Sequence, residues 1–491
     1  MNAMIALQLA FCTPLAGALL IALNGRRPAV REALTMITAI LLFVSVACLA
    51  PAVFDGARPG LIMAEPLPGL SLQLTPEPLG SLFALLASLL WIVTSVYSIG
   101  YMHARQEKNL TRFYTCFALS LWAAMGMALA GNLLTLFVFY EVLTLSTYPL
   151  VTHSGSEQAR RSGRLYLGLL LAPSFGFLLF ALIWTWQLAG TLDFVEGGSL
   201  RGTASPALLG ILFTLYAFGI SKAALMPLHR WLPAAMVAPT PVSALLHAVA
   251  VVKGGVFFLL KVTLYVFGID LVAELQATQW LLYVAAATIL LASLVALSKD
   301  NLKARLAYST ISQLGYIVLG TFLATSSGII GSTLHIVMHA FGKITLFFCA
   351  GAILVATQKT AVSQMHGVGR NMPFTMSAFL IGSLCIIGLP PAGGVWSKWF
   401  LMLATLEAGH QALLVVLMAS SLLSALYLLT VPLRGFFYPS PADMAGKGIR
   451  EAPLACLLAI GLTASGCVGL FFYADSLYAI ARLLTPGDGH G

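Results

Sequence analysis

The chain has 491 residues, of which 59% are hydrophobic and only 9% are charged, and its formal net charge at pH 7 is +9. Soluble domains carry roughly 25% charged residues, so this composition excludes an ordinary soluble protein. Apolar runs long enough to cross a bilayer recur from end to end and leave no room for a soluble domain, which predicts an all-α polytopic membrane protein.

About fourteen membrane-spanning helices are predicted. They are expected near residues 3–24, 32–53, 79–102, 113–131, 133–152, 164–188, 206–226, 241–267, 278–298, 304–324, 328–356, 373–406, 410–433 and 452–474. Basic residues follow the first run and none precedes it, unlike in a cleaved signal peptide, so we expect a permanent first helix. Residues 55–78, with the alternating LSLQL, predict an exterior hairpin or loop, and the tail after Tyr473 is expected to be frayed.

Basic residues alternate between the connections. Eighteen of the 26 Lys and Arg residues fall in the odd-numbered connections, whereas the even connections and the C-terminus hold only Arg58, Arg201 and Arg482. This is the positive-inside pattern, and it predicts cytoplasmic odd connections with both termini outside. The net charge therefore reports topology, and nucleic acid is not an expected partner.

The cysteines give no sign of a metal or redox centre. All seven lie outside any CxxC or Cys/His spacing, and most fall singly inside apolar runs, where small packing residues are common. The sequence also shows no nucleotide or quinone motif. No cofactor and no metal are expected, and any redox centre is expected in other proteins.

Two ionisable residues lie near the middle of predicted spans. Glu141 is the one acidic residue that falls clearly within a span, where a charge costs about 2.5–3.5 kcal/mol even on mild scales. We expect it to face the bundle interior beside a cation. Lys222, a few residues before the helix-breaking Pro227, is the candidate partner. The alternative is a static ion pair that holds helices together.

The eighth span adds further ionisable groups. Lys253 and His247 are predicted to border one cavity, although His247 alone is also typical of a hydrogen-bonded interior histidine. Lys261, near the outer end of the span, either belongs to the same path or extends its long side chain to the membrane surface. His229 and Arg230 are expected at the cytoplasmic turn, where His229 either admits protons or binds carbonyls of the broken helix.

The eleventh span carries His335, His339 and Lys343 at successive i, i+4 steps on one helical face. Two histidines at this spacing can bind a metal, but no HExxH motif or nearby carboxylate supports such a site. Imidazoles titrate near neutrality, so the pattern favours a proton relay.

The twelfth span contains a second break. Pro390 and Pro391 interrupt it, and Lys398 follows, as Lys222 lies beside the first break. Broken helices at corresponding places in two halves are typical of inverted-repeat transporters. The predicted domains are N-terminal helices 1–3 with the hairpin (1–112), a first repeat (113–267), a second repeat (278–433), and a C-terminal loop, helix and short tail (434–491).

Several long stretches resemble one known family. They are KAALMPLHRWLPAAMVAPTPVSALLHAVAVVK, LFVFYEVLTLSTYPL, AYSTISQLGYIVLG, HIVMHAFGKITLFFCAGAI and GLPPAGGVWSKW. These resemble the antiporter-like subunits of respiratory complex I and of Mrp-type cation/proton antiporters, over spans four to thirteen. The resemblance implies fourteen helices with two inverted five-helix repeats, in agreement with the count above.

The resemblance also implies residue roles. Glu141 and Lys222 match the family's glutamate and lysine of spans five and seven, Lys253 the lysine of span eight, and Lys398 the terminal lysine of span twelve. Protons would then move along a lateral chain of charges, triggered when the separation of a Glu–Lys pair changes the proton affinity of the lysine. One departure is Arg164, which stands where many members have lysine.

The function implied is a proton-conducting subunit of a multisubunit Mrp-type Na⁺ or K⁺/proton antiporter, most similar to its D subunit. The alternative is an antiporter-like proton-pumping subunit of a complex I-like NADH:quinone oxidoreductase or a membrane-bound hydrogenase. A membrane scaffold that conducts nothing is a third interpretation. The expected partners are other membrane subunits, protons, Na⁺ or K⁺, and the lipid bilayer of a bacterial inner membrane.

Overall fold

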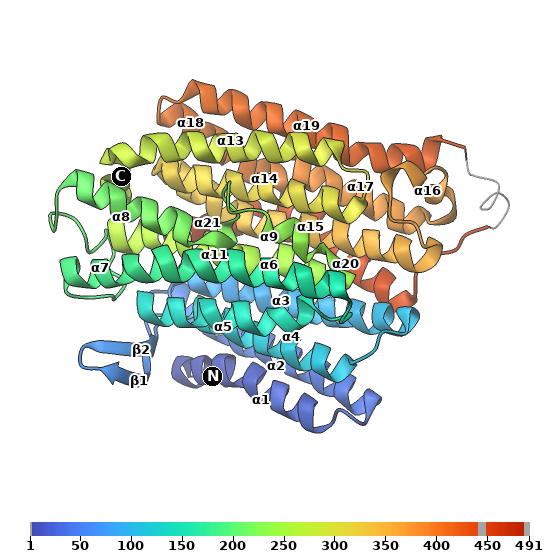
Figure 1. Cartoon of the computed structure of the whole chain (residues 1–491), viewed down its shortest axis with the longest axis horizontal. Coiled ribbons are helices and arrows are strands. Elements are labelled where there is room, and N and C mark those ends of the chain that lie inside the picture. The colour runs from blue at the N-terminus through green and yellow to red at the C-terminus, as the bar shows by residue number, and fades with distance from the viewer. Residues whose placement is uncertain (1, 440–447, 486–491) are drawn as a thin grey trace.

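The computed structural model of the chain describes residues 2–439 and 448–485, apart from the side chains of Leu67, His247 and Val249. Its helices lie side by side in one bundle (Figure 1). Ten helices of the described part are long and apolar enough to cross a membrane, and two shorter apolar helices accompany them. The prediction of an all-α polytopic membrane protein is therefore confirmed.

Three of the first six spans, at Asn2, Asn132 and Ser156, begin with a side chain that caps the helix. Asn132 accepts a hydrogen bond from the amide of Thr135, and Ser156 accepts one from the amide of Ala159, so each side chain satisfies a free donor at a helix start. The spans are α1 (Ala3–Leu23), α2 (Pro28–Phe54), α3 (Pro78–Arg105), α4 (Leu110–Ala128), α5 (Leu133–Val151) and α6 (Glu157–Pro173), the last continued by η1 (Ser174–Leu178) and α7 (Leu179–Ala189).

The seventh span is assembled from short pieces because Pro227 and Pro233 remove backbone donors within it, whereas the eighth has its prolines at the start and contains two π-helical stretches. The seventh comprises α8 (Pro206–Gly219), η2 (Ser221–Ala223), α9 (Trp231–Ala234) and η3 (Ala235–Val237). The eighth comprises α10 (Thr240–Ala244), η4 (Leu245–Val249), α11 (Val251–Lys261) and η5 (Val262–Phe267), and α12 (Ile269–Glu274) follows it.

The second half of the bundle also contains a broken helix. Its elements are α13 (Gln276–Ser298), α14 (Leu302–Leu323), α15 (Ser326–Thr357), η6 (Val362–Gln364), α16 (Val368–Asn371), α17 (Pro373–Ile387), α18 (Gly394–Glu407), α19 (Gln411–Phe437) and α20 (Leu454–Phe472). With α17 and α18 taken as one broken span, residues 2–439 and 448–485 contain fourteen spans, as predicted.

The predicted hairpin is present. Strands β1 (Leu61–Leu67) and β2 (Leu70–Leu74) pair antiparallel, and β2 is the alternating LSLQL segment. The amide of Thr75 donates to the carbonyl of Leu129, which fastens the hairpin to the end of α4. Arg58, just before the hairpin, and Thr485 line the same cavity, so the hairpin and the end of the described chain lie at the same end of the bundle.

The predicted frayed tail is wrong for residues 474–482, which form a helix. Helix α21 (Ala474–Arg482) follows α20, and Ala474 and Ala481 pack against Leu334 and Met338 of α15. The segment ADSLYAIAR repeats small and apolar residues at helical spacing, so one face can be buried against the bundle. The residues after Thr485 lie outside the described part.

Helix α15 forms the centre of the second half. It packs against α14, α17, α18 and α20, and also against α10 and η4 of the first half. Almost all of its residues from Ser327 to Ile353 are buried. The ionisable side chains of this helix are therefore enclosed by other helices, which is where intramembrane charges are tolerated.

Candidate functional site

Lys222 is buried where the seventh span is broken. It lies in η2 and is 0% exposed. Its Nζ donates to the carbonyl oxygen of Tyr140 at 2.7 Å and to Oγ1 of Thr144 at 2.6 Å, and it lies 3.0 Å from the centre of the Tyr140 ring. A buried ammonium requires such acceptors because it has lost its water. Helix α5 supplies all three.

A glycine brings α11 directly against this break. A Cβ built on Gly255 would lie 2.3 Å from the carbonyl carbon of Lys222 and 2.3 Å from the amide nitrogen of Ala223. Any larger residue must therefore displace the main chain that carries the lysine. The position of Lys222 thus depends on close backbone packing between η2 and α11.

Glu141 lies on α5 next to Tyr140, but it does not touch Lys222. Its Oε1 accepts a hydrogen bond from Oγ of Ser174. Among the described residues, no ion pair within 4.0 Å joins Glu141 to Lys222. The predicted proximity of spans five and seven is confirmed by the Lys222–Tyr140 bonds, whereas a direct ion pair is absent. Two charges separated in this way still interact, because the interior screens them weakly.

Sequence reasoning missed Ser174, which begins the π-helical turn η1 in the sixth span. Single π turns within α-helices occur frequently at functional sites, because they redirect side chains. The signal available in the sequence was a polar residue directly after Pro173 within an apolar run. That signal alone did not identify its partner.

Lys253 joins the two halves of the molecule. Its Nζ lies 2.7 Å from Nδ1 of His339, and both side chains are buried, the lysine on α11 and the histidine on α15. An ammonium can donate to the lone pair of a neutral imidazole nitrogen, so one proton is shared between two bases. The sequence predicted both residues as candidates but not their contact.

His335 continues this row towards the twelfth span. The rings of His335 and His339 lie 5.7 Å apart, as their i, i+4 spacing predicts. Nδ1 of His335 lies 2.9 Å from Oγ of Ser397, and the His335 ring lies 5.7 Å from that of Tyr316. Lys398 is the next residue in sequence after Ser397. The row therefore extends from α11 through α15 to α18.

Lys398 is held at the second break. Its Nζ donates to the carbonyl of Ile387, the last residue of α17, at 3.0 Å and to Oγ of Ser421 at 2.9 Å. It also lies 4.7 Å from the centre of the Tyr316 ring. Like Lys222, Lys398 is held by a carbonyl, a hydroxyl and an aromatic ring beside a broken helix.

Lys343 shares the helical face of the two histidines but binds elsewhere. Its Nζ donates to Oγ of Ser309 at 2.6 Å and to the carbonyl of Leu306 at 3.3 Å, both on α14. The hydroxyl of Tyr427 donates to the same Ser309 oxygen at 2.9 Å. A polar cluster thus branches from the row towards α14 and α19.

His229 belongs to the irregular residues between η2 and α9, within a run of turns over residues 226–230. Its ring lies 6.3 Å from that of Tyr308, and its Nδ1 makes no hydrogen bond to the described residues. His247 belongs to η4, and its side chain lies outside the described part.

Lys261 does not extend to the membrane surface, so that alternative is wrong. Its side chain is 0% exposed, and its Nζ lies 2.8 Å from Oε1 of Glu77. Packing by the Phe194 ring, whose centre is 3.9 Å from Nζ, keeps the side chain inside. Sequence reasoning did not single out Glu77, because it lies just before the third span and not within it.

Within residues 2–439 and 448–485, no group of three or more His, Cys, Asp and Glu side chains is arranged to hold a metal ion. The fold and these side chains together define a polytopic membrane protein with a row of ionisable groups in its interior. Residues 130–424 match the family described as NADH:quinone oxidoreductase/Mrp antiporter, transmembrane. The chain belongs to this family, as the resemblance predicted.

The relatives include both NADH-quinone oxidoreductase subunits and a probable antiporter subunit. NADH-quinone oxidoreductase subunit N of Desulforudis audaxviator is 33% identical over 426 residues, which cover 84% of each chain. A probable K(+)/H(+) antiporter subunit of Rhizobium meliloti is 30% identical over 441 residues, which cover 85% of this chain but 43% of that protein. The chain likewise spans only 45% of the chloroplast NAD(P)H-quinone oxidoreductase subunit 5 of Adiantum capillus-veneris.

The fold is shared with a solved antiporter complex. A chain of the Mrp complex from Dietzia sp. DQ12-45-1b superposes with a TM-score of 0.86 at 22% identity, covering 99% of this chain and 97% of that one. This likeness supports the fold, in which two broken helices interrupt the bundle.

Proposed function

We propose that the chain is the proton-conducting subunit of a multisubunit Mrp-type Na⁺ or K⁺/proton antiporter. The observation that carries this proposal is the buried contact between Lys253 and His339, which joins the two halves of the bundle at a distance over which a proton can pass. With the neighbouring His335 and Ser397, it forms a row of groups that can each accept and donate a proton.

Protons would enter the row near Glu141 and Lys222. A change in the distance between these two charges alters how strongly Lys222 holds its proton, because opposite charges stabilise each other. Lys222 then delivers a proton towards Lys253, and the histidines relay it to Lys398. We propose His229, His247 and Lys343 as side branches through which water reaches this row.

The domain assignment follows the same proposal. Residues 113–267 and 278–433 would each carry one broken helix with one lysine, as in inverted-repeat transporters. Residues 1–112 and 434–491 would flank them. We also propose that the chain assembles with other membrane subunits in a bacterial inner membrane, with both termini on the exterior side.

The test uses inverted vesicles from cells that express the complete native operon, with a fluorescent dye that reports the pH gradient. Adding Na⁺ or K⁺ without an electron donor is expected to dissipate the gradient in the wild type. Lys253→Ala is expected to abolish this response, whereas Lys108→Ala, which changes an exposed lysine between α3 and α4, is expected to retain it. Normal exchange in Lys253→Ala would contradict the proposal.

A second candidate function is an antiporter-like pumping subunit of a redox complex. The specific observation in its favour is the similarity to NADH-quinone oxidoreductase subunit N over 84% of both chains. In the same vesicles this candidate predicts no response to cations but proton uptake when an electron donor such as NADH is added. A wild type that shows neither response would leave the non-conducting scaffold as the remaining interpretation.

A further inference from the structure

A second buried glutamate–lysine pair lies outside the row described above. Glu77 precedes α3 and Lys261 ends α11, and their charged atoms are 2.8 Å apart. The lysine side chain is 0% exposed and the glutamate side chain 10%. Both lie at the end of the bundle that carries the hairpin, which the charge pattern predicts to be the exterior side.

The surroundings of Lys261 resemble those of Lys222. Lys261 Nζ donates to the carbonyl of Ala130 at 2.8 Å and lies 3.9 Å from the centre of the Phe194 ring. Lys222 has the carbonyl and ring of Tyr140 in the same roles. Each ammonium is thus held by one carbonyl and one aromatic face, with a glutamate nearby. The difference is that Lys261 contacts its glutamate directly.

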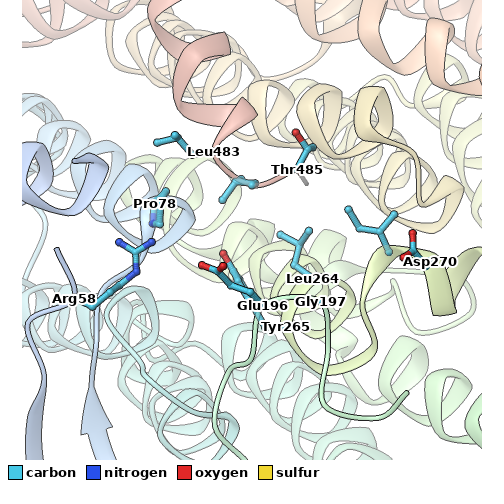
Figure 2. A pocket seen from close by; sticks show the side chains of 11 residues that line it. Arg58, Pro78, Glu196, Gly197, Leu264, Tyr265, Asp270, Leu483 and Thr485 are labelled. Carbon is cyan, nitrogen blue, oxygen red and sulfur yellow. The ribbon is translucent and has the colours of Figure 1, made fainter. Parts of the chain in front are cut away.

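Two neighbouring cavities lie outside this pair. The inner one, of about 90 Å³, is lined by Glu77 and Thr75, and the outer one, of about 270 Å³, extends to Asp270. They share Arg58, Glu196 and Tyr265, whose side chains gather around the outer cavity in Figure 2. A water molecule needs roughly 10–15 Å³ of such space, so both cavities hold several. Water can therefore reach the carboxylate of Glu77.

On the inner side, aromatic packing separates the pair from Lys253. Phe257 lies one helical turn from both lysines of α11, and its ring stacks on Phe83 with centroids 4.8 Å apart. Lys261 Nζ lies 5.6 Å from the centre of the Phe257 ring. An apolar constriction of this kind excludes water and ions. In this conformation the cavities adjoin the pair on one side, and the packed rings of Phe257 and Phe83 lie between the pair and Lys253 on the other.

We propose that Glu77 is the exterior proton-binding site of this chain, with Lys261 as its counter-charge. A proton from water in the cavities binds the Glu77 carboxylate and breaks the ion pair, and its release restores the pair. The other charged or titratable groups that face the pair are Arg58, Glu196 and Tyr265. Arg58 and Glu196 carry opposite charges, so Lys261 remains the decisive neighbour of Glu77. This inference rests on the proposed proton-conducting function.

The test varies the pH inside inverted vesicles of the complete complex, because their lumen corresponds to the exterior side. The pH outside is held constant, and the rate of cation-driven proton movement is recorded. Glu77→Gln is expected to remove the dependence on luminal pH and to lower the maximal rate by about tenfold or more. The dependence on outside pH is expected to stay unchanged. Glu65→Gln changes an exposed carboxylate of the hairpin that lines neither cavity; it is the matched control and is expected to behave as wild type.

Glu77→Gln leaves Lys261 buried without the carboxylate that it contacts, so a second variant is needed as a control for misfolding. Glu77→Gln/Lys261→Met removes both charges and is expected to fold and to lack the luminal pH dependence. A wild-type luminal profile in either variant would overturn the exterior site. Lys222→Ala separates the two proposals. If Lys222→Ala is inactive while Glu77→Gln keeps the wild-type luminal pH profile, only the exterior site is contradicted. If Lys222→Ala exchanges normally, the proposed function is contradicted.

Discussion

Nζ of Lys253 and Nδ1 of His339 lie 2.7 Å apart, although the two residues are separated by 86 positions in the sequence. The lysine belongs to the first half of the bundle and the histidine to the second. Both side chains are buried. This contact is the one place where a direct bond between ionisable side chains crosses from α11 to α15 in the described part of the chain.

His339→Ala is expected to abolish cation-driven proton movement, because it removes the imidazole that contacts Lys253. His339→Gln keeps a polar group but cannot exchange a proton, so it is expected to be as inactive as the alanine variant. Dye-detected exchange in inverted vesicles measures both, with the amount of inserted protein determined by immunoblotting. Normal exchange in His339→Gln would show that the contact is only structural.

Two variants, Glu141→Gln and Ser174→Ala, distinguish the effect of the Glu141 charge from the effect of its hydrogen bond to Ser174. Glu141→Gln is expected to lower the exchange rate strongly, by about 10²-fold or more, because the charge near Lys222 is removed. Ser174→Ala removes a single hydrogen bond and is expected to lower it by less than about tenfold. Initial exchange rates at saturating cation measure both variants. Equal losses in the two would contradict a role for the Glu141 charge.

Gly255→Ala is expected to destabilise the protein by about 1–3 kcal/mol, because its Cβ would overlap the backbone that carries Lys222. Gly168→Ala in α6 is the matched control, since nothing lies within 4 Å of its Cβ position. It is expected to be neutral or to stabilise by about 0.5–1 kcal/mol. Thermal unfolding of the purified protein in detergent measures both, and equal midpoints would contradict the close packing of η2 on α11.

Lys261→Ala is expected to be strongly destabilising, in contrast to the mild effect of a lysine that extends to the membrane surface. Loss of one partner from a buried ion pair costs about 3–5 kcal/mol, because the other charge stays buried. Lys261→Met combined with Glu77→Gln is expected to recover most of this loss. The yield of folded protein after detergent extraction measures the single and the double variant. A double variant that folds as poorly as Lys261→Ala would contradict a paired state.

Asp300, in the connection between α13 and α14, contributes to the stability of the fold in a pH-dependent way. The amide and hydroxyl of Ser363 donate to its two oxygens at 2.8 and 2.7 Å and hold the pKa of this carboxyl below its usual value. Because the folded pKa is the lower one, the stabilisation is complete above the ordinary Asp pKa of about 3.9 and is lost as the pH falls through the folded pKa. The side chain is exposed, so the effect is small.

Asp300→Asn is therefore expected to lower the unfolding midpoint slightly at neutral pH and to match the wild type in strong acid. Thermal unfolding followed from neutral pH down to about pH 3 checks the convergence. A difference that persists unchanged to the lowest pH would show that the charge of Asp300 is not responsible.

The number of spans, the two broken helices, the hairpin and the family could all be predicted from the sequence. Each depends on a local pattern: apolar length sets a span, proline removes a donor, and alternation sets a strand. Glu141, Lys222, Lys253 and Lys398 could be chosen as candidates, because charges within apolar runs are conspicuous. The helical tail α21 was missed, since a short amphipathic segment resembles a frayed end until a partner surface is known.

Which of these groups meet could not be predicted, because it depends on the packing of helices that are distant in the sequence. Ser174 bonds to Glu141 across 33 positions, and Lys253 meets His339 across 86. Glu77 and Lys261 likewise come together from two distant helices. Such contacts depend on how helix faces pack, and in a membrane many faces are equally apolar, so hydrophobicity does not select among them. Close backbone packing, as at Gly255, and the need of buried charges for partners make that selection.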